Sequence, residues 1–249
     1  MKKANHVSKH LDRLTERSST SLLAAPRHTL MLFGIVTLLA VAGAFNARYN
    51  TGVSQVPDSS GMIKNDLIMI GMLWFWVYFV FKGMRDYSQS IRQFFGAKAV
   101  TLRAIFADLL LAALAFGFIY VCTSWVHALV PSPPINNPLL TVTPQGIGGV
   151  AVWIVLSISA GVCEEIVFRG YLQRQLASFT GNFGIAIVVQ SITFGVGHAY
   201  EGIASISAII LHGLVLGALA YWRGNIRAGV IEHAGWDLLA GFGLISANW

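Results

Sequence analysis

Long apolar runs without charge are the feature that most constrains what this chain can fold into. One of them, residues 147–162, contains no charged residue, and comparable runs recur from residue 29 onward. Of the 249 residues, 55% are hydrophobic and 11% are charged, whereas a soluble domain carries about 25% charged residues. Helices that satisfy their own backbone hydrogen bonds can cross a bilayer. The sequence therefore predicts an all-α, polytopic transmembrane helical bundle in the cell membrane.

We expect about seven spans, because about 20 apolar residues are enough to cross a bilayer. They are residues 29–45, 67–81, 104–130, 147–168, 183–197, 203–222 and 228–246. The predicted regions are a basic tail (1–28), N-terminal helices with a Pro-rich linker (29–146) and a C-terminal helical region that carries the chemistry (147–249). Residues 170–179 are partly polar, so they either prolong the fourth helix or lie at the interface.

Lys and Arg alternate between the two sides of this predicted bundle. Fifteen of the 17 fall on the side of the N-terminal tail, and only Arg48 and Lys64 fall on the other. An excess of Lys and Arg marks the cytoplasmic side of a membrane protein. The N-terminus is therefore predicted to be cytoplasmic, and the linker at residues 131–138 to lie outside. The net charge of +6 belongs to these loops, so we expect the lipid bilayer and not nucleic acid as a partner.

Two adjacent carboxylates, Glu164 and Glu165, follow directly on the charge-free run, and Arg169 comes four residues after the second. A charged side chain at the centre of a bilayer costs about 2.5–3.5 kcal/mol on insertion scales. Residues i and i+4 share a helix face, so Glu165 and Arg169 can neutralise each other. Glu164 projects about 100° away around the helix, so its carboxylate is not used by this ion pair and is available for another role. The Glu165–Arg169 pair by itself is equally compatible with a structural clasp.

Two further pairs in apolar runs have the same spacing. Phe194 and His198 end the fifth predicted span, and His233 and Asp237 lie in the seventh. We expect Asp237 to reach the imidazole of His233, because a carboxylate on one ring nitrogen fixes the tautomer and directs the other nitrogen. No role is assigned to five ionisable residues without a new partner at helical spacing: Asp108, His127, Glu201, His212 and Glu232.

Together, the three motifs resemble a known family. The motifs Glu164-Glu165-x-x-x-Arg169, Phe194-x-x-x-His198 and His233-x-x-x-Asp237, in this order, are similar to those of the CAAX-protease and bacteriocin-processing (CPBP, or Abi) family of intramembrane peptidases. The resemblance covers roughly residues 147–246 and implies catalytic roles for the six ionisable members of these motifs. One departure is Asp237, since the best-known eukaryotic members resemble His-x-x-x-Asn here. An ionised Asp, unlike Asn, cannot donate to an oxyanion.

The resemblance implies an intramembrane endopeptidase that hydrolyses a peptide bond in a membrane-associated protein or peptide. The chain has no Gly-x-Ser-x-Gly or His-Glu-x-x-His motif, so the serine and zincin signatures are absent. Two routes stay open. In one, Glu164 and His198 activate a water while His233 faces the oxyanion; in the other, Glu164, His198 and His233 hold zinc, the only candidate cofactor, as in a metalloprotease. We favour the first route.

Two other functions are compatible with the motifs. One is a non-catalytic membrane scaffold or bacteriocin-immunity-type factor. The other is a transporter, which is less favoured because no internal repeat is visible. The predicted spans also leave a geometric conflict. At 1.5 Å per residue, His198 lies about 22 Å from the cytoplasmic end of its span and His233 only about 10 Å, so straight spans would not bring them together.

Overall fold

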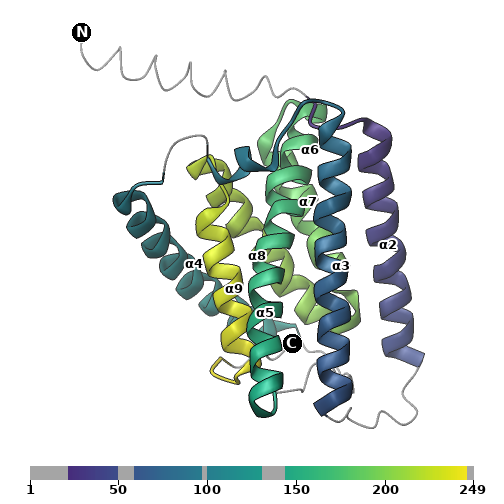
Figure 1. Cartoon of the computed structure of the whole chain (residues 1–249), viewed down its shortest axis with the longest axis vertical. Helices are drawn as coiled ribbons and strands as arrows, with labels where there is room; N and C mark the ends of the chain where they lie inside the picture. The colour runs from purple at the N-terminus through teal and green to yellow at the C-terminus, as the bar shows by residue number, and fades with distance from the viewer. Residues whose placement is uncertain (1–21, 50–58, 97–99, 131–143, 246–249) are drawn as a thin grey trace.

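The computed structural model describes residues 22–49, 59–96, 100–130 and 144–245, which form a bundle of helices (Figure 1). The described residues contain no strand, and the predicted helical membrane bundle is confirmed. The long helices are α2 (Pro26–Tyr49), α3 (Ser59–Arg85), α4 (Leu102–Leu129), α5 (Gly146–Glu164), α7 (Phe183–Gly197), α8 (Ile203–Arg223) and α9 (Arg227–Gly241). Most of the predicted basic tail and of the Pro-rich linker lies outside the described residues.

All seven predicted spans are helices, but they differ in length. Five segments in the described part of the chain are long and apolar enough to cross a membrane: Pro26–Asn46, Ser59–Arg85, Leu102–Leu129, Gly146–Thr180 and Ile203–Arg223. Helices α7 and α9 have 15 residues each, which is fewer than the about 20 that a full crossing needs. They pack against longer neighbours, α7 against α8 and α9 against α5.

The fourth predicted span is the longest helical segment. Helix α5 continues through the π-helical turn η3 (Glu165–Leu172) into α6 (Gln173–Thr180), and together they make one segment of 35 residues. Residues 170–179 therefore prolong the helix. It ends at Gly181, whose φ of 66° is the left-handed conformation that favours glycine at a helix end. The Asn182 side chain then accepts hydrogen bonds from the first backbone amides of α7, so the chain reverses direction here.

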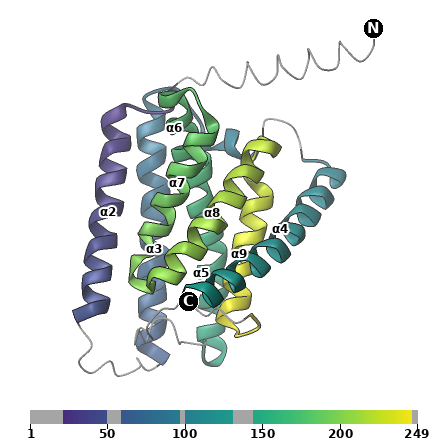
Figure 2. The same cartoon turned by 180° about the vertical axis from the view of Figure 1, so that it is seen from behind.

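This reversal removes the conflict in depth between the predicted site residues. From Glu164 to Thr180 the helix advances by about 16 residues, or about 24 Å, and α7 returns by about 22 Å before it reaches His198. His198 therefore comes back to the level of Glu164. Helix α9 begins deeper, because the α6–α7 turn stands beyond the α8–α9 turn (Figures 1 and 2). His233, in the second turn of α9, therefore lies at about the same depth in the bundle as Glu164 and His198.

One end of the bundle is called the basic end here. It contains the α6–α7 turn, the α8–α9 turn, the C-terminal end of α3 and the short helix η1 (Ile91–Phe95). Buried Asp108 of α4 lies 2.6 Å from Arg223 Nη2 and 2.6 Å from Arg227 Nε. Helix α4 lies obliquely at the side of the bundle, where it packs against α8 and α9 (Figure 2). The two ion pairs therefore attach α4 to the basic end. They were not predicted, because the partners lie on other helices.

The start of α2 is attached to the same end by buried polar contacts. The backbone amide of Leu23 donates to Gln175 Oε1 (2.7 Å), and Gln175 Nε2 donates to the carbonyl oxygen of Ala24 (2.8 Å). The hydroxyl groups of Thr29 and Tyr171 lie 2.9 Å apart. Helix α2 therefore begins earlier than the predicted first span, and the residues just before it are held by α6.

Candidate active site

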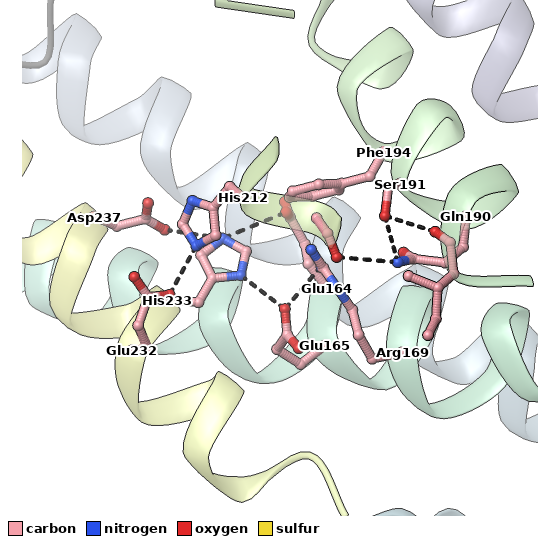
Figure 3. Close-up of polar contacts among 12 residues, drawn as sticks. Glu164, Glu165, Arg169, Gln190, Ser191, Phe194, His212, Glu232, His233 and Asp237 are labelled. Carbon is pink, nitrogen blue, oxygen red and sulfur yellow. Dashed lines mark hydrogen bonds and ion pairs between the residues drawn. The ribbon is translucent and has the colours of Figure 1, made fainter. Parts of the chain in front are cut away.

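The two adjacent glutamates at the junction of α5 and η3 have different surroundings (Figure 3). Glu165 is fully buried, and its Oε1 lies 2.8 Å from Nη1 of the equally buried Arg169. The side chain of Glu164 is 19% exposed, and its Oε2 has no hydrogen-bond partner among the described residues. The i, i+4 pair predicted from the sequence is present, and Glu164 stands beside it.

Phe194 of α7 joins the first motif to the histidines. The Arg169 Cζ atom lies 4.3 Å from the centroid of the Phe194 ring, a cation–π contact that shields the guanidinium group. The same ring lies edge-on to His198, at 5.0 Å between centroids, and to His233, at 5.8 Å. The three predicted motifs therefore converge around one buried aromatic side chain.

Glu165 orients His233. His233 Nδ1 donates to Glu165 Oε1 across 3.2 Å, and this bond joins α9 to η3 (Figure 3). Gly229, one turn before His233, leaves room for the Glu165 carboxylate, because a Cβ atom at position 229 would lie 2.8 Å from Glu165 Oε2. His233 Nε2 is 3.7 Å from Glu164 Oε2 and 3.8 Å from Asp237 Oδ2, both too long for hydrogen bonds. The bond to His233 that we expected from Asp237 is made by Glu165, since a neighbouring helix brings this carboxylate closer.

His198 sits just after the last residue of α7. Its Nδ1 donates to the carbonyl oxygen of Phe194 (2.9 Å), so Nε2 of the neutral ring is the acceptor. The residues that follow form the short helix η4 (Ala199–Glu201), which links α7 to α8. Burial raises the pKa of the Glu201 carboxyl, and a hydrogen bond from Tyr200 opposes this shift. Among the described contacts, none joins His198 directly to Glu164 or His233.

The predicted zinc ligands do not form a metal-binding set. In the described part of the chain, no three His, Cys, Asp or Glu side chains are arranged to hold one metal ion, and this includes Glu164, His198 and His233. These residues therefore do not fit zinc as arranged, and we derive no step through a metal.

A second buried pair lies directly behind His233. His212 Nε2 of α8 donates to Glu232 Oε2 of α9 across 2.7 Å, and both side chains are buried. The His212 ring lies 5.6 Å from the His233 ring. The sequence analysis assigned no role to either residue, because their partners are not at helical spacing. A usable signal was present, since ionisable residues in different apolar spans tend to pair with one another.

The fold and the site together define a polytopic helical membrane protein with an acid–histidine–arginine cluster between its helices. Residues 146–239 match the protein-family model described as type II CAAX prenyl endopeptidase Rce1-like. This match confirms the resemblance to the CAAX-protease family that the three motifs predicted. No curated protein and no solved structure matches the chain. At the family level the match supports a CAAX-protease-like intramembrane peptidase, an enzyme of the protease type.

Proposed function

We propose that this chain is an intramembrane endopeptidase that hydrolyses a peptide bond in a membrane-associated protein or peptide, with Glu164 as the base that activates water. The observation that carries the proposal is the difference between the two adjacent glutamates. Glu165 is fully buried and lies within 3.2 Å of Arg169 and His233, whereas Glu164 is 19% exposed and lies 3.7 Å from His233. The match of residues 146–239 supports the protease class.

In this mechanism, a water molecule between Glu164 and His198 loses a proton to the Glu164 carboxylate while its oxygen attacks the carbonyl carbon of the peptide bond. The carbonyl oxygen becomes the oxyanion of a tetrahedral intermediate. When the intermediate collapses, the C–N bond breaks and Glu164 passes its proton to the leaving amine. Glu164 is then ionised again, and both products are released.

His233 is the donor to the oxyanion in this proposal. Its Nδ1 proton is held by Glu165, so its Nε2 donates to substrate in the imidazolium form. The carboxylates of Glu164, Glu165 and Asp237 surround the ring with negative charge, which favours this form by Coulomb attraction. Arg169 acts through Glu165, because it holds that carboxylate in place.

The test is cleavage of a membrane-proteome peptide library by purified protein in detergent. We expect Glu164→Gln to abolish cleavage while the protein stays folded, because Gln cannot take a proton from water. Asp86→Asn, an exposed position at the basic end, is the matched control and should cleave like the wild type. A Glu164→Gln variant that cleaves normally would overturn the proposal. A wild type that cleaves no peptide would favour the non-catalytic scaffold or immunity-type factor.

Metal content tests the competing route. We expect active purified protein to carry no stoichiometric zinc, because the described side chains do not form a metal-binding set. Elemental analysis of the purified protein is the measurement, since a buried metal exchanges slowly and chelation could miss it. Stoichiometric zinc that disappears when Glu164, His198 or His233 is replaced would establish the zinc mechanism instead.

A further inference from the structure

A second set of buried polar side chains lies between α6, α7, α8 and α9. It consists of Gln173, Gln190, Ser191, His212 and Glu232, each no more than 4% exposed, and is called the polar file here. None of the five has a part in the proposed mechanism. Polar side chains are costly in the interior of a membrane protein unless their donors and acceptors are satisfied.

Hydrogen bonds within the protein satisfy only the nitrogen of each glutamine amide. Gln173 Nε2 donates to the carbonyl oxygen of Gly217 (3.0 Å), and Gln190 Nε2 donates to Ser191 Oγ (2.8 Å) and to the carbonyl oxygen of Gly213 (3.2 Å). The amide oxygens of Gln173 and Gln190 receive no hydrogen bond from any described residue. If these glutamines only held α8 against its neighbours, the hydrogen bonds of their amide nitrogens would be explained. The buried amide oxygens without a partner would not be explained.

Two glycines one turn apart on α8 bring these amides together. A Cβ atom at Gly217 would lie 2.7 Å from Gln190 Nε2 and 2.8 Å from Gln173 Oε1. At Gly213 it would lie 3.0 Å from Ser191 Cβ. The polar atoms of α6 and α7 therefore occupy the space that side chains on α8 would otherwise fill, and they face each other across Gly217.

Toward the candidate active site, the polar file continues through His212, the neighbour of Gly213. His212 is bonded to Glu232, whose Oε1 has no hydrogen-bond partner among the described residues. The centroids of the His212 and His233 rings are 5.6 Å apart, and His233 Nε2 is 3.7 Å from Glu164 Oε2. His233 Nε2 and Glu164 Oε2 are too far apart for a direct hydrogen bond, and one water molecule can bond to both.

Toward the basic end, the next residue on this face of α8 after the polar file is Tyr221. This residue lies one turn beyond Gly217 on the same face of α8, is half-buried, and packs against Phe183 at 4.7 Å between ring centroids. Phe183 is the first residue of α7, at the turn that Figures 1 and 2 show at the outer limit of the bundle. Solvent is therefore close to this end of the polar file.

We propose that the polar file binds a chain of water molecules and carries water from the basic end of the bundle to Glu164. Water offers the donors that the amide oxygens and Glu232 Oε1 need, and it can link groups that stand too far apart to bond directly. Hydrolysis consumes one water per peptide bond, and the polar file would give this water a route to Glu164 from the basic end. The transport role rests on the proposed peptidase function, whereas the hydration of the polar file does not.

Hydroxyl-radical footprinting of purified protein, without substrate, measures the hydration. Radiolysis of bound internal water oxidises adjacent side chains even where bulk solvent does not reach them. We expect His212 to be oxidised at least about tenfold faster than Phe94, a fully buried residue in an apolar cluster, after correction for intrinsic reactivity. This rate should fall to the Phe94 level in Gln190→Met and stay high in Gln190→Asn.

Peptide cleavage by the same two variants separates water supply from packing. Met has nearly the volume of Gln, so a packing role predicts that Gln190→Met is the better tolerated change. A water-conducting role predicts the opposite order. Gln190→Met should lower kcat about tenfold with KM unchanged, and the kcat of Gln190→Asn should be higher than that of Gln190→Met.

Each result decides a different part of the proposal. His212 oxidation no faster than that of Phe94, or unaffected by Gln190→Met, would overturn the hydrated polar file even if Glu164→Gln abolishes cleavage. Rapid oxidation of His212 in a protein whose Glu164→Gln variant still cleaves would support the hydrated file and overturn the peptidase mechanism. Hydration without the kcat effect of Gln190→Met would overturn the transport role alone.

Discussion

At the scale of residues, two chemically identical neighbours acquire different tasks from their surroundings. Glu165 has an arginine and a histidine within hydrogen-bond distance, and both of its partners are buried. The side chain of Glu164, one residue earlier, projects about 100° away around the helix and is 19% exposed. Burial of an ion pair that is well paired costs far less than burial of one charge, so Arg169 makes the buried Glu165 tolerable.

Replacing Arg169 should therefore damage the fold. In Arg169→Ala, the buried Glu165 loses its cation and the Phe194 ring loses its cation–π partner. We expect the free energy of unfolding to fall by about 3–5 kcal/mol, the usual cost of removing one member of a buried pair. Thermal or denaturant unfolding in detergent measures this, with Glu164→Gln as a control that should unfold like the wild type. Identical unfolding of Arg169→Ala and wild type would contradict the structural importance of the pair.

Asp237 gives a separate test at the same scale. Its Oδ2 atom lies 3.8 Å from His233 Nε2, and Glu165 already orients this ring, so the carboxylate is not needed as an orienting group. Asp237→Asn removes one negative charge beside His233 but supplies an N–H donor near the oxyanion position; we expect the new donor to outweigh the lost charge, so that kcat/KM is kept or raised. A loss of about 10–100-fold would instead indicate that Asp237 orients a metal ligand. Steady-state cleavage of one library-derived peptide gives the comparison.

At the scale of elements, the close approach of α5 and α9 sets the distance between the first motif and His233. Gly161 lies one turn before Glu165, and it meets Ala234, the residue after His233. A Cβ atom at Gly161 would lie 2.7 Å from the backbone nitrogen of Ala234 and 2.9 Å from its Cα. Backbone atoms cannot move aside as a flexible side chain can. Small residues at such contacts allow membrane helices to pack closely.

We therefore expect Gly161→Leu to force α5 and α9 apart and to lower both stability and cleavage. Overpacking typically costs about 1–3 kcal/mol, and the shift of α9 would also stretch the 3.2 Å bond between His233 and Glu165. Gly71→Leu is the control, because nothing lies within 4 Å of a Cβ atom at this position on α3. The two variants are compared by unfolding in detergent and by peptide cleavage. Equal behaviour of both would show that this contact does not position the site.

At the scale of the whole molecule, the described helices run alternately up and down, which agrees with the alternation of Lys and Arg along the chain (Figure 1). The basic end contains Arg174 of α6 as well as Arg223 and Arg227, which flank the α8–α9 turn and are paired with Asp108. The asymmetry of Lys and Arg predicts that this end faces the cytoplasm.

Reporter fusions test this orientation. A reporter within residues 131–143 should be read as external, and one between Arg223 and Arg227 as cytoplasmic, because positively charged loops are retained on the inner side. A cytoplasmic signal from residues 131–143 would contradict the seven-helix topology. A fusion before residue 22 should give the cytoplasmic signal as well, since the N-terminal tail carries six of the 17 Lys and Arg residues.

The sequence by itself determined the helices and the pairs within them. Apolar runs, basic loops and i, i+4 spacing are local patterns, so the bundle and the Glu165–Arg169 ion pair could be predicted without knowledge of neighbouring helices. Helix ends were less accurate: the fourth span continues to Thr180, and α7 and α9 are too short for a full crossing. These ends depend on caps such as Gly181 and on the neighbours that bury a short helix.

Only the tertiary structure decided which side chains meet across helices. Glu165 takes the place expected of Asp237 on His233, and His212 pairs with Glu232, because distances between helices follow from glycine contacts and helix depth. In the described part of the chain, Glu164, His198 and His233 are likewise not arranged to hold one metal ion. Such contacts join residues 20 to 68 positions apart, and no helical period encodes them.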